Sequence, residues 1–124
     1  VWDAGERRPV RLMGIDTPEV FDPAGTGERL DHAEPFGPEA SQFTKDFISG
    51  GEVRFRFGRR RLDQYDRLLA YVFVGDRMLN EELAREGLAE AKTYAGDESP
   101  LSRRIEQAES EAREARRGIW SQGQ

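Results

Sequence analysis

The stretch Arg11-Leu12-Met13-Gly14-Ile15-Asp16-Thr17-Pro18-Glu19 carries the chain's most informative combination of residues. The apolar-rich run 10–15 predicts a buried strand, and Pro18 ends it because proline fixes its own backbone and removes a ladder donor. An arginine inside an apolar strand is costly unless an anion meets it. A cation, two carboxylates and a hydroxyl at one strand end therefore favour phosphate chemistry. A solvated turn with a surface ion pair is the plain alternative.

The chain's length and composition predict one domain over residues 1–124, large enough for a core without disulfides or structural metal. It contains no cysteine, which suits an exported protein as well as a cytosolic one. No run approaches the roughly 20 apolar residues of a membrane span, so we expect no membrane partner. The chain begins at Val1 rather than Met, and we expect that an upstream segment has been removed.

The charge balance is acidic, with 24 Asp and Glu against 19 Lys and Arg, for a formal net charge of −5. Proteins that simply coat nucleic acid are usually basic, because phosphate neutralisation supplies most of their affinity. An acidic chain can act on nucleic acid where its positive charge is local. Nearly all of that charge is arginine, whose planar fork suits phosphate but which also serves as an ordinary solubilising residue.

Turn and periodicity signals predict several short strands. The first strand ends at Trp2, a turn with Gly5 follows, and the chain returns over 7–15. Strands are also expected over 53–57 and 68–74, with Arg59-Arg60-Arg61 in a loop between them and a two-residue hairpin turn at Gly75-Asp76. The segment 20–36 lacks periodicity and predicts a long functional or mobile loop.

Three helices are predicted. The first begins at Gly37-Pro38-Glu39, and its inward stripe is Ala40, Phe43, Thr44, Phe47 and Ile48. The second is short and capped by Asn80, and the third is amphipathic from Leu101 to Ile119. Together these elements favour a small α+β domain built on a closed or nearly closed barrel.

The sequence resembles the thermonuclease, or staphylococcal-nuclease-like, domain family from Val1 to Ser121. Five landmarks occur in the family's order at close to its spacing. They are Arg11 with Asp16-Thr17-Pro18-Glu19, Gly37-Pro38-Glu39-Ala40, Asp63-Gln64-Tyr65-Asp66-Arg67 leading into Leu69-Ala70-Tyr71, Asn80-Glu81-Glu82-Leu83 with Gly87-Leu88-Ala89, and Ile119-Trp120-Ser121. The resemblance implies an OB-fold, a five-stranded barrel with three helices.

The resemblance also implies Ca2+-dependent hydrolysis of DNA and RNA to 3′-phosphate and 5′-hydroxyl products. It places Arg11 and Arg67 as the guanidinium groups that hold the scissile phosphate. It makes Asp16 a calcium ligand through its carboxylate and Thr17 one through its carbonyl. Glu19 falls on the proposed general base, and Tyr65 on a residue that contacts a nucleotide phosphate. Ca2+ prefers oxygen ligands of these kinds.

The chain departs from the family in ways that leave a second function open. The family's first strand and its Asp-Gly-Asp-Thr turn, which supplies another calcium carboxylate, have no counterpart before Arg11. Two tyrosines of the family's nucleotide pocket fall on Thr93 and Ala95, with Tyr94 between them. The competing function is a catalytically degenerate OB-fold module that binds nucleic acid or protein. We expect a monomer, secreted or in a bacterial cell envelope.

Several residues have a structural alternative. Arg67 could form an ion pair with Asp63 or Asp66 instead of a phosphate contact. For Arg59-Arg60-Arg61 a solvated loop competes with a nucleic-acid contact. We expect His32 to be a solvated loop residue and Trp120 to pack in the core.

Overall fold

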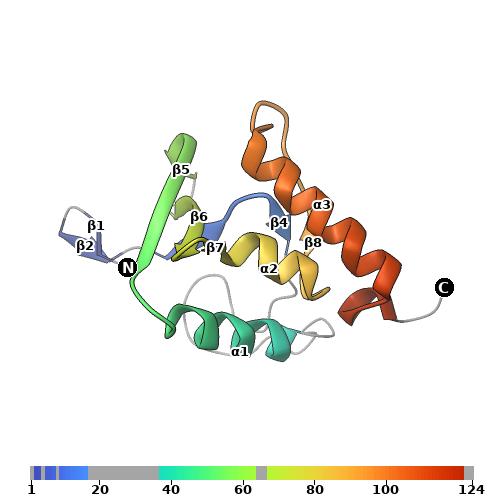
Figure 1. Cartoon of the computed structure of the whole chain (residues 1–124). Helices are drawn as coiled ribbons and strands as arrows, with labels where there is room; N and C mark the ends of the chain where they lie inside the picture. Colours follow the sequence, from blue (N-terminus) through green and yellow to red (C-terminus); the bar gives the residue numbers. More distant parts are fainter. Residues whose placement is uncertain (1, 4, 8, 17–36, 64–66, 122–124) are drawn as a thin grey trace.

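The structure is a computed structural model, and it describes residues 2–3, 5–7, 9–16, 37–63 and 67–121 (Figure 1). Its central sheet has the order β3-β6-β5, and β7 also pairs with β6. These strands are β3 (Val10–Leu12), β5 (Val53–Leu62), β6 (Leu68–Val74) and β7 (Arg77–Met78). β3 runs parallel to β6, and the other pairs are antiparallel.

Two small antiparallel pairs flank this sheet. β1 (Trp2–Asp3) pairs with β2 (Glu6–Arg7), and β4 (Ile15–Asp16) pairs with β8 (Glu90–Ala91). The α+β class is confirmed. The described strands form three separate sheets, so they do not confirm the closed five-stranded barrel.

The three predicted helices are present as α1 (Gly37–Ile48), α2 (Leu79–Arg85) and α3 (Pro100–Ala115), followed by the 3-10 helix η1 (Gly118–Ser121). Figure 1 shows α2 between the sheet and α3, with α1 on another side of α2. Ser99 caps α3, because its hydroxyl accepts from the Ser102 N–H and the Ser102 hydroxyl accepts from the Ser99 N–H. The apolar core lies where β6, α2 and α3 meet.

The predicted strand over 10–15 is interrupted. Met13 and Gly14 form a turn between β3 and β4, and Gly14 has a φ of +79°. A Cβ at Gly14 would lie 2.8 Å from Cδ1 of Ile105, so α3 packs directly on this glycine. Alternation therefore does not run through the whole stretch, although Met13 and Ile15 are both buried. The turn re-aims the chain so that Asp16 ends on the exposed surface.

The predicted loop at Arg59-Arg60-Arg61 is wrong, because all three arginines lie within β5. The register with β6 is regular from Val53 to Phe57, then shifts before Leu62 pairs with Leu68. This irregularity lets a strand continue past the point where inside–outside alternation stops. Five of the ten residues in β5 are arginine and none is acidic, so the strand is strongly cationic.

The predicted cap at Asn80 is also wrong. Asn80 is the second residue of α2, Met78 precedes the helix, and no side chain caps it. The Asn80 side chain is fully buried, accepting from Val72 N–H at 3.0 Å and donating to Met13 O at 2.8 Å and Ala70 O at 3.2 Å. The side-chain hydrogen bonds of Asn80 therefore link α2 to β6 and to the turn before β4.

Two predicted helix stripes extend too far. In α1, Ala40 and Phe47 are buried, but Ile48 is 41% exposed because it lies at the helix end. The helix predicted as amphipathic from Leu101 to Ile119 ends at Ala115, which is exposed, whereas Ile105, Ala108 and Ala112 of α3 are buried. Trp120 is half-buried with the Arg113 guanidinium 4.1 Å from its ring centre, consistent with packing.

Candidate functional site

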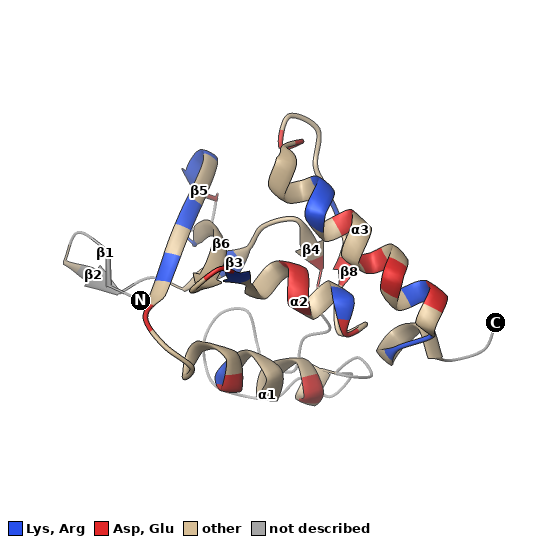
Figure 2. Cartoon of the chain, viewed as in Figure 1, with Lys and Arg blue, Asp and Glu red and all other residues tan. Residues whose placement is uncertain are grey.

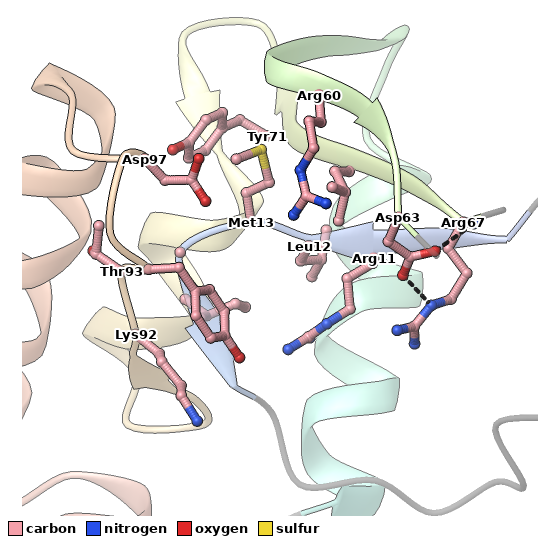
Figure 3. Close-up of a pocket in the computed structure, with 14 residues that line it drawn as sticks. Arg11, Leu12, Met13, Arg60, Asp63, Arg67, Tyr71, Lys92, Thr93 and Asp97 are labelled. Atoms are coloured by element: carbon pink, nitrogen blue, oxygen red, sulfur yellow. Dashed lines mark hydrogen bonds and ion pairs between the residues drawn. The ribbon is translucent and has the colours of Figure 1, made fainter. Parts of the chain in front are cut away.

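A cleft of about 350 Å³ lies between the central sheet and segment 92–97 (Figure 3). We call it the first cleft. Its lining comprises Arg11, Leu12, Met13, Gly14, Ile15, Arg60, Asp63, Arg67, Leu69, Tyr71, Lys92, Thr93, Tyr94 and Asp97. Four of these residues are cationic and two are carboxylates, so the cleft is locally positive in a chain of net charge −5. Such a surface attracts an anion.

The parallel pairing of β3 with β6 brings together Arg11 and Arg67, the two arginines predicted to hold the scissile phosphate. Arg11 pairs with Leu69, and Arg67 directly precedes β6, two residues before Leu69. Both arginines line the first cleft. Figure 3 shows both side chains extending on the same side of the β3 ribbon, while Arg60 points from β5 toward the centre of the cleft. Two residues that are 56 positions apart thus reach one site.

Arg67 also forms the ion pair that the sequence left open as an alternative. Its Nε donates to Oδ2 of Asp63 at 2.7 Å, and its backbone N–H donates to Oδ1 at 2.9 Å. Both residues are half-buried, so this contact is better shielded than an ordinary surface pair. Asp63 holds the guanidinium in place at the side of the cleft. The ion pair and a phosphate contact are therefore compatible.

Arg11 and Arg60 differ from Arg67, because neither forms an ion pair with any residue that the structure describes. Arg11 is half-buried, and Arg60 is exposed. A half-buried guanidinium without a carboxylate favours an anionic ligand, since its charge is partly desolvated and uncompensated.

Asp16 ends β4 with an exposed side chain, and Glu90 on β8 is its direct cross-strand partner. Like charges directly opposite destabilise an antiparallel pair, so a cation between them would relieve the repulsion. Within the described ranges, no group of three or more His, Cys, Asp or Glu is placed to hold a metal ion. Thr17, Glu19 and Tyr65 lie outside the described residues, as does His32.

Lys92 and Glu90 carried no site prediction. Arg60 was predicted in a loop, with a nucleic-acid contact as one of two alternatives, and the structure places it in β5 at the first cleft. The two-residue strands β4 and β8 have no periodicity from which their pairing could be predicted. Tyr94 was noted between the two family tyrosine positions, and the structure places it in the cleft, 56% exposed, with Lys92 Nζ 5.5 Å from its ring centre.

Comparison with known proteins decides the family. The family model described as staphylococcal nuclease homologue matches residues 9–122. The chain belongs to this family. The match includes Asp16 and the two arginines predicted to hold the phosphate, Arg11 and Arg67, and it covers nearly the whole chain.

Named relatives of this staphylococcal nuclease family chain include two thermonucleases. That of Staphylococcus hyicus is 40% identical over 117 residues, and that of Staphylococcus intermedius is 41% identical over 116 residues. Each alignment covers 94% of this chain and 65% of the relative. Endonuclease YncB of Bacillus subtilis is 34% identical over 122 residues, covering 94% of this chain and 53% of the relative. The chain thus spans between about half and two thirds of these relatives.

No helix within the described ranges has both the length and the apolar character needed to cross a membrane.

Proposed function

We propose that this chain is a nuclease that hydrolyses phosphodiester bonds of DNA and RNA. The observation that carries the proposal is the placement of Arg11 and Arg67 together in the lining of a locally positive cleft. Membership of the staphylococcal nuclease family and the names thermonuclease and endonuclease among the relatives support it.

The two arginines would hold the scissile phosphate and stabilise the charge that builds on its oxygens during attack. A guanidinium suits this role because its donors form a rigid fork that matches two phosphate oxygens. Donors fixed in advance are worth the most, since they need no reorganisation during the reaction. The Asp63 contact fixes Arg67 in this way, which makes Asp63 a positioning residue.

Asp16 would hold a Ca2+ ion through its carboxylate, and Thr17 through its backbone carbonyl. Bound Ca2+ would supply positive charge beside the phosphate and a place for the attacking water. The donor chemistry on β4 and β8 fits such an ion, because the Asp16 carboxylate has the Glu90 carboxylate directly across from it. Glu90 would then add charge to a ligand set for which the family uses an aspartate upstream.

Glu19 would act as the general base, taking a proton from the attacking water. The water oxygen bonds to phosphorus while the bond from phosphorus to the 5′ oxygen breaks. The departing 5′ oxygen takes a proton from solvent, which leaves a 3′-phosphate and a 5′-hydroxyl. Tyr65 would contact a phosphate of the bound nucleotide. In the region that family tyrosines occupy, Tyr94 is the aromatic residue at the cleft, while the Thr93 hydroxyl donates to Glu106 at 3.0 Å.

Release of acid-soluble nucleotides from single-stranded DNA and from RNA tests the proposal. We expect activity that requires Ca2+ and that falls by roughly 10²-fold or more in Glu19→Gln, since a positioned base contributes about that much. Circular dichroism of the variant controls for folding. A folded chain that binds nucleic acid without cleaving it would instead establish the degenerate binding module.

A further inference from the structure

Segment 91–94 forms the wall of the first cleft that faces Arg11 and Arg60. Figure 3 shows Lys92 and Thr93 on one side of the cleft and the two arginines on the other. β8 ends at Ala91, and residues 92–94 have no regular secondary structure. The position of this wall therefore depends on contacts with other elements.

Glu109 on α3 holds the outer edge of β8. Ala91 pairs with Ile15 of β4, and the Ala91 N–H donates to Oε2 of Glu109 at 2.7 Å. The other carboxylate oxygen of Glu109 lies 3.4 Å from Nε of Arg113, and the Glu109 side chain is only 16% exposed. A hydrogen bond to a carboxylate is stronger than one between neutral groups. Glu109 thus takes the place of a neighbouring strand at the edge of β8 that pairs with no described strand.

Glu106 holds the next part of the same segment. The Thr93 hydroxyl donates to Oε2 of Glu106 at 3.0 Å. Glu106 and Glu109 are three residues apart, so they lie on one face of α3. The Lys92 N–H donates to Gly14 O at 2.8 Å. The wall is therefore bonded to α3 and also to the turn before β4.

The side chains that this wall presents to the cleft are Lys92 and Tyr94. Both are exposed, both line the first cleft, and Lys92 Nζ lies 5.5 Å from the centre of the Tyr94 ring. Lys92 forms no ion pair with any residue that the structure describes. An ammonium beside an exposed ring offers a bound nucleotide a positive charge and a flat apolar surface.

We propose that Glu106 and Glu109 are positioning residues of the first cleft, which hold segment 91–94 so that Lys92 and Tyr94 contact the bound nucleotide. This inference rests on the proposed function. Charge alone acts in the opposite direction, because a carboxylate near the cleft repels a phosphate. Loss of the two negative charges should strengthen nucleotide binding, whereas loss of the two hydrogen-bond acceptors should weaken it. Glutamine separates these effects, since its amide oxygen still accepts.

The test measures the dissociation constant of a thymine dinucleotide at low salt, with a chelator present so that the ligand is not cleaved. In Glu106→Ala/Glu109→Ala we expect about tenfold weaker binding. Glu106→Gln/Glu109→Gln should bind as tightly as the parent or more tightly. The matched control is Glu114→Ala, which removes an exposed carboxylate from α3 outside the cleft and should not weaken binding.

Two further measurements show whether the glutamates act through the wall. Lys92→Met should weaken dinucleotide binding about fivefold, and in that background the double alanine change should have a smaller effect than in the parent, because coupled residues are not additive. Hydrogen exchange at the Ala91 amide should be about tenfold faster in Glu109→Ala than in the parent. It should stay slow in Glu109→Gln, which keeps the acceptor.

The outcomes separate this inference from the proposed function. If folded Glu106→Ala/Glu109→Ala binds the dinucleotide as tightly as Glu114→Ala, or if the alanine and glutamine variants lose the same affinity, the positioning role is overturned. Should the double alanine variant not fold by circular dichroism, Glu106→Ala decides alone, with about threefold weaker binding expected at this exposed residue. If Arg11→Gln leaves dinucleotide binding unchanged, the proposed function itself fails. Weaker binding in Arg11→Gln with no effect of the glutamate variants keeps the proposed function and rejects only the positioning role.

Discussion

Arg85 on α2 and Arg11 on β3 are the same residue type in opposite surroundings. Arg85 is bonded to three glutamates, with Glu81 and Glu111 each at 3.1 Å and Glu82 also in contact. Glu81 in turn accepts from Arg104 on α3 at 2.7 Å. Arg11 has no ion pair with any residue the structure describes. Figure 2 shows the contrast, with basic residues alone along β5 and both signs mixed on α3.

The pKa of Glu81 reflects the pairing of charges between α2 and α3. Burial by itself would raise that pKa, but hydrogen bonds from Arg104 and Arg85, with their charges, outweigh it and hold the pKa below its usual value. Burial lowers the pKa of Arg85, yet its glutamates raise it overall. Charges on the helical side thus satisfy one another and hold α2 to α3. At the first cleft Arg67 is paired with Asp63, whereas Arg11 and Arg60 form no ion pair with any residue that the structure describes.

The largest expected effect is on catalysis at Arg11, which has no ion pair with any residue that the structure describes. Arg11→Gln should lower nuclease activity by about 10²–10³-fold, because it removes a donor to the transition state. The free energy of unfolding should change little, since no described ion pair is lost. Activity assays and urea unfolding of this variant and of Arg103→Gln would check both. Near-normal activity would show that Arg11 is not a phosphate ligand.

Arg67 has a carboxylate partner, as Arg85 does, and it lines the first cleft, as Arg11 does. Arg67→Lys keeps the charge near Asp63 but loses the planar fork, so activity should fall on the order of 10²-fold. Asp63→Asn should lower activity less, with Arg67 still present but less firmly held. If Arg67→Lys kept more than about half the activity, Arg67 would be reassigned to a structural ion pair.

Asn80 links the two regions, because it lies on α2 and bonds to the turn before Asp16. Asn80→Ala should destabilise the protein by about 2–4 kcal/mol, since it leaves buried backbone groups unpaired and a small cavity. It should also weaken Ca2+ binding at Asp16 through the displaced turn. Urea unfolding and calorimetric Ca2+ titration measure the two effects, with Gln42→Ala on exposed α1 as control. Unchanged stability would contradict the role given to Asn80.

A paired arginine should show the reverse of Arg11. Arg85→Met should lower the free energy of unfolding by about 1–3 kcal/mol, because it removes the cation that pairs with Glu81, Glu82 and Glu111. The activity of the folded fraction should remain near normal. Arg103→Met, on exposed α3, is the matched control. A loss of activity without a loss of stability would show that Arg85 serves the cleft and not the packing of α2 on α3.

The smallest expected effect is pH dependence from Glu81. Its pKa is lower in the folded state than the usual 4.5, so the folded state binds fewer protons there. This stabilisation is complete above 4.5 and is lost as pH falls through the folded pKa. Urea unfolding from neutral pH down to about pH 3 should give a shallower acid decline in Glu81→Gln than in the parent. Parallel curves for the two proteins would exclude this contribution.

The sequence by itself determined the elements with strong local signals. The apolar run located β6, and Gly75 marked the hairpin turn that follows it. Pro38 located the start of α1, and the 3.6-residue stripe of Ile105, Ala108 and Ala112 located α3. It also singled out Arg11 and Asp16, because a charged residue inside or at the end of an apolar run conflicts with burial unless a ligand explains it. The family resemblance added Arg67.

Tertiary structure decided what depends on distant partners. Asn80 is a plausible cap from local sequence, but pairing with β6 and the Met13 turn draws its amide into the core. Arg59, Arg60 and Arg61 look like a loop in the sequence, but they lie in β5, at the register shift between Phe57 and Leu62. Glu90 meets Asp16 only through a two-residue ladder. Local propensity is a short-range term, and these positions are fixed by long-range hydrogen bonds and packing. The same long-range contacts determine which arginines are neutralised and which face the cleft.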